Sequence, residues 1–129
     1  MFSLNNKGQS LVMFIIIFPI FLFIITLIYD VGNAIYEKNS LSNINYIVVE
    51  YALLNIDTIR EEDIVDLINE NDNDVNDISI MIINNSVDIT LEKDIKGVFG
   101  KIFDFNLTSV RSEYKGEMID NKTKIERVK

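Results

Sequence analysis

The chain has 129 residues and a net charge of −8, and it contains neither cysteine nor histidine. This composition excludes disulfides and thiolate metal sites and removes the commonest general base and zinc ligand, so we expect no enzyme, no metal and no cofactor. The acidic balance also argues against binding nucleic acid, because phosphates attract a basic surface.

An uncharged apolar run over residues 11–28 predicts a transmembrane helix. Eighteen helical residues span about 27 Å, close to the hydrocarbon thickness of a bilayer. A signal peptide has a shorter apolar core and a small-residue cleavage site, which residues 29–33 do not supply. A buried core helix of a soluble protein is the other alternative, although only about 100 residues follow and many of them are polar. Pro19 lies within the run, where membrane helices tolerate proline.

The charges at the two ends of the run indicate its orientation. Lys7 precedes the helix and Asp30 follows it, and positive charge at a helix end favours the cytoplasm. We therefore predict a single-pass protein of the cell membrane. Its N-terminus is cytoplasmic, its membrane helix covers residues 9–29, and its C-terminal head is extracytoplasmic.

Helical character is predicted to continue past the membrane over residues 30–55. A stripe with a period near 3.5 residues is formed by Ala34, Leu41, Ile44, Val48 and Tyr51. The stripe packs either on a partner or on the head of the same chain, and both alternatives stay open.

A second amphipathic helix is predicted for residues 57–69, with Thr58 as N-cap and Glu61 completing a capping box. Residues 70–77 form an acidic loop with a partial likeness to a calcium-binding loop. Asp77 and Ile83 stand where such a loop needs glycine and glutamate, so we expect a solvated loop.

Three strands are predicted for the remainder of the head. Residues 78–83 and 87–92 flank an Asn-Asn-Ser turn signal, and residues 106–115 form the third strand. Residues 117–129 are expected to be a charged, frayed tail. The predicted fold is α+β: a long N-terminal transmembrane helix extends outward and is followed by a small head, residues 56–116, with a three-stranded antiparallel sheet and one or two short helices.

Residues 95–103 combine helical apolar spacing with two glycines. The simpler interpretation is a short helix or loop that covers the sheet. The alternative is an apolar patch that rests on the membrane surface or on a neighbouring subunit.

A motif surrounds the start of the apolar run. Lys7, Gly8 and Gln9 form a junction at which a peptidase could cut. The later motif positions are Val12, Met13, Phe14, Pro19, Asp30 and Gly32. Over residues 7–36 the chain resembles the N-terminal region of the TadE/TadG-like proteins, pseudopilins of tight-adherence pilus systems with a type IV pilin-like N-terminus. The resemblance is specific because the proline and the Asp-x-Gly element fall in register with the glycine.

The resemblance implies that a prepilin peptidase removes residues 1–8 on the cytoplasmic face and leaves Gln9 as the new N-terminus. It implies partners in the peptidase, other pilins or pseudopilins, the pilus assembly platform and the lipid bilayer. Met13 stands where the family has a glutamate that pairs with a neighbour's free amine, and Asn33 replaces the usual arginine. Because a buried amine without its partner is costly, the chain fits a minor subunit better than a major one.

Two classes of function follow. The first is a TadE-like minor pseudopilin that takes part in assembling a tight-adherence-type pilus or a related secretion filament. The alternative is an unprocessed single-pass adaptor or sensor subunit whose external head binds another envelope protein. Cleavage after Gly8 distinguishes them. An enzyme is disfavoured further because no paired-carboxylate site, phosphate loop or nucleophile motif stands out.

Overall fold

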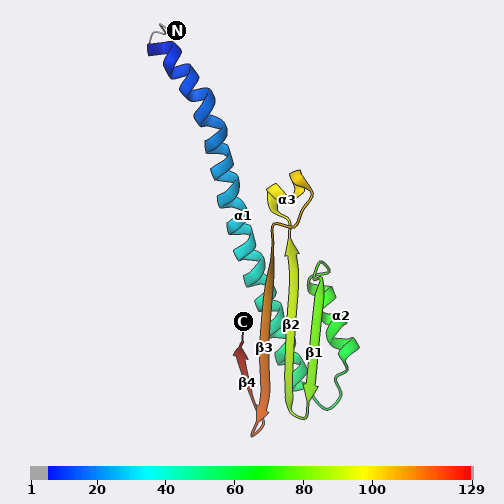
Figure 1. The fold of residues 1–129 in the computed structure, drawn as a ribbon. Coiled ribbons are helices and arrows are strands. Elements are labelled where there is room, and N and C mark those ends of the chain that lie inside the picture. The colour runs from blue at the N-terminus through cyan, green and yellow to red at the C-terminus, as the bar shows by residue number, and fades with distance from the viewer. Residues whose placement is uncertain (1–5, 129) are drawn as a thin grey trace.

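One long helix forms the axis of the molecule. The structure, a computed structural model, describes residues 6–128 and the side chains of residues 8–128, so most of the expected leader lies outside the described range. Helix α1 (Asn6–Leu54) has 49 residues and extends over about 73 Å at 1.5 Å per residue. Figure 1 shows its first half clear of the head and its second half lying along it. The prediction of a long apolar N-terminal helix followed by a small α+β head is confirmed.

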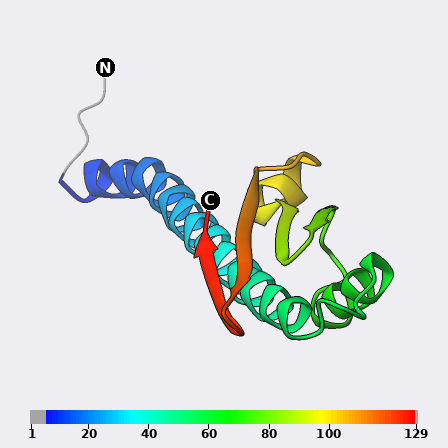
Figure 2. The same ribbon diagram turned by 90° about the horizontal axis from the view of Figure 1, so that it is seen from below.

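The head contains two short helices and one sheet. Helix α2 (Glu61–Asn71) follows α1, and α3 (Gly97–Phe103) joins the second and third strands. The sheet is antiparallel in the order β1-β2-β3-β4, with strands β1 (Asp77–Ile83), β2 (Ser86–Ile95), β3 (Thr108–Ile119) and β4 (Lys122–Arg127). Seen from below, the sheet arches over α1 and α2, which share one of its faces (Figure 2).

The sheet has four strands, so the prediction of three is wrong. The additional strand, β4, lies in the segment expected to be a charged tail. Asp120 and Asn121 both have positive φ angles, 50° and 63°, and turn β3 back into β4. A two-residue turn of this kind matches the twist of a hairpin. Because β4 lies at the sheet edge, where lysines are common, its sequence lacks the apolar alternation that revealed the other strands.

The core lies between the sheet and residues 41–53 of α1, hereafter the packed segment. Its fully buried helix residues include Leu41, Val48, Val49, Ala52 and Leu53, and they face Val87, Ile89, Leu91, Ile95 and Val110. The alternating residues Val87, Ile89 and Leu91 therefore lie on the buried face of β2.

The predicted stripe of α1 packs on the chain's own head, but it is only partly correct. Leu41 and Val48 are fully buried, whereas Tyr51 is 47% exposed. A helix with 3.6 residues per turn drifts away from a stripe of period 3.5, so burial passes to Ala52 and Leu53.

Two contacts set how α1 lies on the sheet. A Cβ at Gly116 would come within 2.5 Å of Leu53 Cδ1 and 2.8 Å of Val49 Cγ1, so any other residue there would have to displace these side chains. The buried Asn45 side chain donates from Nδ2 to the carbonyl oxygens of Ile89 and Ser112, at 3.0 and 3.1 Å. These bonds tie one position of α1 to β2 and β3 together.

The expected N-cap of α2 is also wrong. The chain turns after α1, and the Asn55 carbonyl accepts the N–H of Thr58 at 3.0 Å. Thr58 is therefore part of this turn, and α2 begins at Glu61 with Arg60 as its N-cap. The Asp63 carboxylate closes the cap by accepting the backbone N–H of Arg60 at 3.2 Å.

Candidate functional site

The first candidate surface is residues 11–28 of α1, hereafter the bare segment. Its large apolar side chains are 40–67% exposed. Within the described part of the chain, α1 is the helix long and apolar enough to cross a membrane, and its apolar window is not buried by the head. A helix that is apolar all round must be covered by lipid or by other protein. This surface is consistent with anchoring by a single membrane pass.

The first motif positions of the resemblance lie at or just before the start of this surface. Gly8 and Gln9 are in the first turns of α1, while the side chain of Lys7 lies outside the described residues. The next three motif side chains are exposed, with values of 46% for Val12, 54% for Met13 and 60% for Phe14. No carboxylate occupies these three positions, so the bare segment offers a neighbour an apolar surface there.

Pro19 does not interrupt the helix. Helix α1 continues through Pro19, although proline removes one backbone hydrogen bond. The one polar side chain of the bare segment, Thr26, donates its hydroxyl to the Leu22 carbonyl at 2.9 Å. This bond within the helix satisfies the hydroxyl, as an apolar medium requires.

The second candidate site is the junction at Asp30, where α1 leaves the bare segment. Asp30 is only 1% exposed, and its carboxylate accepts the N–H groups of Val98 at 2.7 Å and Phe99 at 3.2 Å. These residues open α3, whose first N–H groups have no partner within the helix. A motif position of α1 therefore holds α3 in place across 68 residues of sequence.

Gly97 makes this contact possible. Its φ is +67°, and an added Cβ would lie 2.8 Å from the Asp30 carboxyl carbon. Gly97 is thus required both by its backbone angle and by the space that Asp30 occupies. Gly32, the other glycine near the junction, has nothing within 4 Å of an added Cβ, so no packing within the chain requires it.

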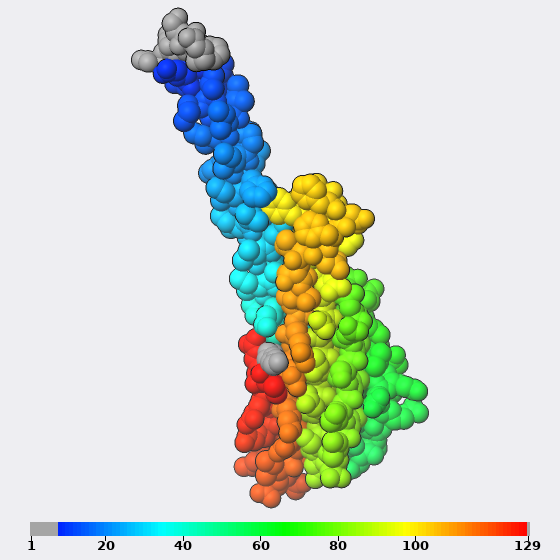
Figure 3. All heavy atoms as spheres, viewed as in Figure 1, coloured from blue at the N-terminus to red at the C-terminus, as the bar shows by residue number. Residues whose placement is uncertain are grey.

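Helix α3 lies against α1 and beyond the end of β2, so the expectation that residues 95–103 cover the sheet is wrong (Figure 1). The Phe99 ring packs on Phe23 of the bare segment, with ring centroids 4.9 Å apart. The space-filling view shows this region touching α1 where the helix emerges from the head (Figure 3). The contact brings part of the head alongside the predicted membrane segment.

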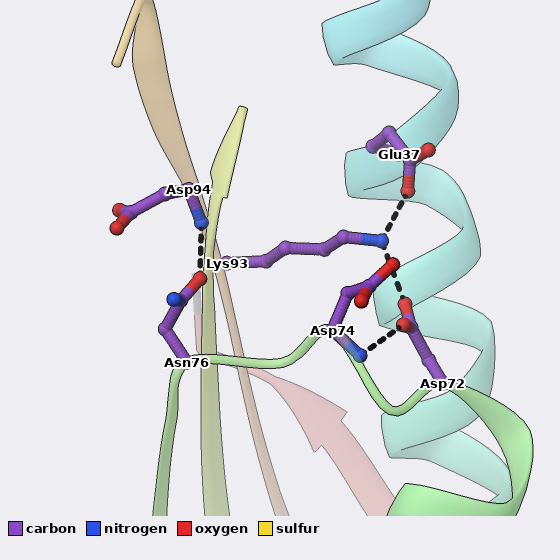
Figure 4. Close-up of polar contacts among 6 residues, drawn as sticks. All are labelled: Glu37, Asp72, Asp74, Asn76, Lys93 and Asp94. Atoms are coloured by element: carbon purple, nitrogen blue, oxygen red, sulfur yellow. Dashed lines mark hydrogen bonds and ion pairs between the residues drawn. The ribbon is translucent and has the colours of Figure 1, made fainter. Parts of the chain in front are cut away.

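The third candidate site is a charged cluster around Lys93 (Figure 4). The Lys93 ammonium donates to Glu37 Oε2 at 2.8 Å and to Asp72 Oδ2 at 2.9 Å. The three side chains are 11%, 25% and 14% exposed. Burial acts to lower the pKa of Lys93, but the hydrogen bonds to Glu37 and Asp72 outweigh it, so this pKa is raised above its ordinary value. The cluster joins β2, α1 and the loop after α2.

The acidic loop of residues 70–77 is therefore not simply solvated. Besides its bond to Lys93, Asp72 accepts the Asp74 N–H at 2.9 Å, and Asn76 Oδ1 accepts the Asp94 N–H at 2.7 Å. Through these bonds the loop is attached to β2. Among the described residues, no group of three or more acidic side chains is arranged to hold a metal ion.

The sequence singled out Asp30 and Gly32 but not the partners that matter for Asp30. Gly97 was noted only as an interruption of helical spacing, and Lys93, Glu37 and Asp72 had no distinguishing pattern. A glycine just before a short apolar helix was the available signal for the α3 contact, because a buried carboxylate needs N–H donors.

The comparisons with known proteins agree with the motif. The family model described as TadE-like protein matches residues 8–44. The match confirms the resemblance drawn from the residues, and it includes the bare segment, Asp30 and the start of the packed segment. No curated protein and no solved structure matches the chain. Over residues 8–44 the chain is similar to TadE-like proteins, while α2, α3 and the sheet lie outside the matched residues.

Proposed function

We propose that this TadE-like chain is a minor pseudopilin, a membrane-anchored and non-catalytic subunit that takes part in assembling a tight-adherence-type pilus or a related secretion filament. The proposal rests on the contrast between the exposed first part of α1 and the part that packs on the head. The family match begins at Gly8 and the bare segment follows. The same unbroken helix then packs on the sheet of the head. Helices of other subunits can cover the bare segment in place of lipid while the head stays folded.

The proposed partners follow from the two ends of the helix. A prepilin peptidase acts between Gly8 and Gln9, before the bare segment. Other pilins or pseudopilins and the assembly platform contact the bare segment within the membrane. The head extends outside the cytoplasm, because Lys7 and Asp30 flank the bare segment with opposite charge.

Processing is tested by the intact mass of the chain extracted from membranes of a host with an active prepilin peptidase. We expect a mature chain that begins at Gln9. Replacing Gly8 by leucine should block cleavage without preventing membrane insertion.

The matched control is Gly32→Leu, because the space around Gly32 is open and the variant should be cleaved normally. An intact N-terminus in the unsubstituted chain would contradict the pseudopilin proposal and favour the unprocessed adaptor or sensor.

Met13 supports the assignment to a minor subunit. A methionine is readily buried in lipid, whereas a carboxylate at this depth costs a few kcal/mol unless it is paired. The chain alone should therefore be stable in the membrane and should form no homopolymeric filaments when overexpressed. Met13→Glu should lower its stability in the membrane, and Met13→Leu should leave it unchanged.

The orientation is tested with single cysteines, since the chain has none. In spheroplasts, Asn73→Cys in the loop after α2 should react with a membrane-impermeant thiol reagent. Ser10→Cys, at the other end of the bare segment, should react only after lysis. The opposite pattern would show that the head is cytoplasmic.

A further inference from the structure

The tip formed by α3 and the residues after it exposes several large apolar side chains. Ile102 is 66% exposed, Phe103 67% and Phe105 45%. Three neighbouring apolar side chains that are exposed at one tip call for a specific cover.

The position of this tip relative to α1 identifies the cover. Phe99 of α3 packs on Phe23, which precedes the end of the bare segment at residue 28 by five residues, or about 7.5 Å along the helix. If the bare segment spans the hydrocarbon layer, α3 lies at the level of its outer edge. Interfacial helices bury their apolar face about 5–10 Å into the same region.

The backbone of the tip suits an apolar medium. Asp30 accepts the N–H groups of Val98 and Phe99 at the start of α3. At its end, the Gly100 carbonyl accepts the N–H of Phe105 at 3.0 Å. An added Cβ at Gly100 would collide with the Phe105 carbonyl oxygen, so glycine permits this compact ending. Unsatisfied backbone groups are costly in lipid, and these bonds reduce that cost.

The charges around the tip also fit a membrane surface. Lys96 and Lys101 precede the exposed apolar residues of the tip, and Asp104 lies between Phe103 and Phe105. Lysine side chains extend along apolar surface and place their ammonium groups among lipid headgroups.

We propose that the α3 tip, through Ile102, Phe103 and Phe105, inserts into the outer-leaflet interface of the bilayer that α1 spans. The head then has two attachments to the membrane, the bare segment and the tip, joined by Asp30 and the Phe23–Phe99 contact. The second attachment fixes the rotation of the head about α1. The inference rests on the membrane anchor of the proposed function, but not on cleavage or filament assembly.

The test uses single tryptophans, because the chain contains none. The full chain is reconstituted in liposomes that carry brominated acyl chains labelled at shallow or deep positions. Phe103→Trp reports on the tip. Phe21→Trp, near the middle of the bare segment, reports on the anchor. Met81→Trp, at a 58% exposed position of β1, is the matched control on the head.

We expect Phe103→Trp emission to be blue-shifted and quenched most by shallow bromines, Phe21→Trp to be quenched most by deep bromines, and Met81→Trp not to be quenched. If Phe103→Trp behaves like Met81→Trp while Phe21→Trp is quenched, the anchor stands and the inference is wrong. A blue shift at Phe103→Trp without lipid quenching, increasing with protein density, would assign the tip to a second copy and overturn the inference. If Phe21→Trp is not quenched, the membrane anchor fails as well.

Discussion

The bare segment and the packed segment of α1 belong to one helix but have opposite surroundings. In the bare segment, apolar side chains point in every direction and all of them are exposed. In the packed segment, one face is buried against the sheet while Tyr46, Ile47 and Tyr51 stay 44–58% exposed. Apolar periodicity therefore separates the part of the helix that the chain covers itself from the part that lipid or other subunits must cover.

Asp30 lies between the two segments, just beyond the end of the bare segment. A carboxylate at this point would otherwise stand beside the membrane surface, and here it is buried under α3 and accepts two backbone N–H groups. The head thereby reaches back over the end of the bare segment. The motif aspartate thus organises the junction, whereas the apolar residues on either side determine what covers each segment.

The two segments should differ most in how a leucine-to-alanine substitution changes the free energy of unfolding of the head. Leu41→Ala should lower the free energy of unfolding of the head by about 2–5 kcal/mol, because it leaves a cavity in the core. Leu22→Ala should change it by less than about 0.5 kcal/mol, since Leu22 is 47% exposed in the absence of lipid. Denaturant unfolding in detergent micelles measures both. Equal effects would show that the bare segment supports the head.

Removing the junction should have the next largest effect. Asp30→Ala should cost about 2–3 kcal/mol of local stability, because two charge-assisted hydrogen bonds to α3 are lost. The expected readout is faster hydrogen exchange at the Val98 and Phe99 amides, with the amides of β2 less affected. Asp57→Ala, an exposed acidic position, is the control. Unchanged exchange at α3 would show that other contacts hold it.

The Lys93 cluster tests how firmly the packed segment is joined to the loop after α2. Lys93→Met should lower stability by about 1–3 kcal/mol, because Glu37 and Asp72 lose their common donor. Lys122→Met, on the exposed edge strand, should have little effect.

The pH dependence of this cluster has a definite sign. The pKa of Lys93 is raised in the folded chain, so its contribution is complete below the ordinary value near 10.5 and is lost as the pH rises through the folded pKa. Unfolding curves from neutral to strongly alkaline pH should show this loss in the unsubstituted chain and not in Lys93→Met. A loss between pH 5 and 8 in both proteins would have to come from other groups.

Substitutions at Gly116 and Gly32 should have the smallest effects on the free energy of unfolding, with opposite signs. Gly116→Ala should destabilise the head by about 1–2 kcal/mol, because the new methyl must displace Leu53 and Val49. Gly32→Ala should be neutral or stabilising by up to about 1 kcal/mol, because the space around it is open and alanine favours a helix. Thermal unfolding of both variants in the same micelles measures the difference, and destabilisation of similar size would contradict it.

The parts of the fold with regular apolar patterns could be predicted from sequence. The uncharged run over residues 11–28 and the alternation of Val87, Ile89 and Leu91 each depend on residues close in the chain. Strand β4 could not be predicted in this way, because Ile125 is its one apolar residue and the edge position allows polar side chains on both faces.

The site was less predictable because its contacts join distant segments. The sequence identified Asp30 through its spacing from Gly8, but its partners Val98 and Phe99 lie 68 and 69 residues away. Nothing in the sequence pairs Lys93 with Glu37, and they form a partly buried ion pair only because β2 lies beside α1. The alternative of an apolar patch on the membrane surface at residues 95–103 stays a prediction, and the Phe23–Phe99 contact places α3 beside the bare segment.

Quantitative mass spectrometry of sheared surface filaments from the native host tests most directly whether this chain is a minor pseudopilin. A minor pseudopilin predicts a small share of this chain, always starting at Gln9, beside a more abundant pilin that carries a carboxylate where this chain has Met13. Filaments composed mainly of this chain would show that a missing glutamate is compatible with a major subunit. Filament-associated chain that retains residues 1–8 would contradict the processing on which the account rests.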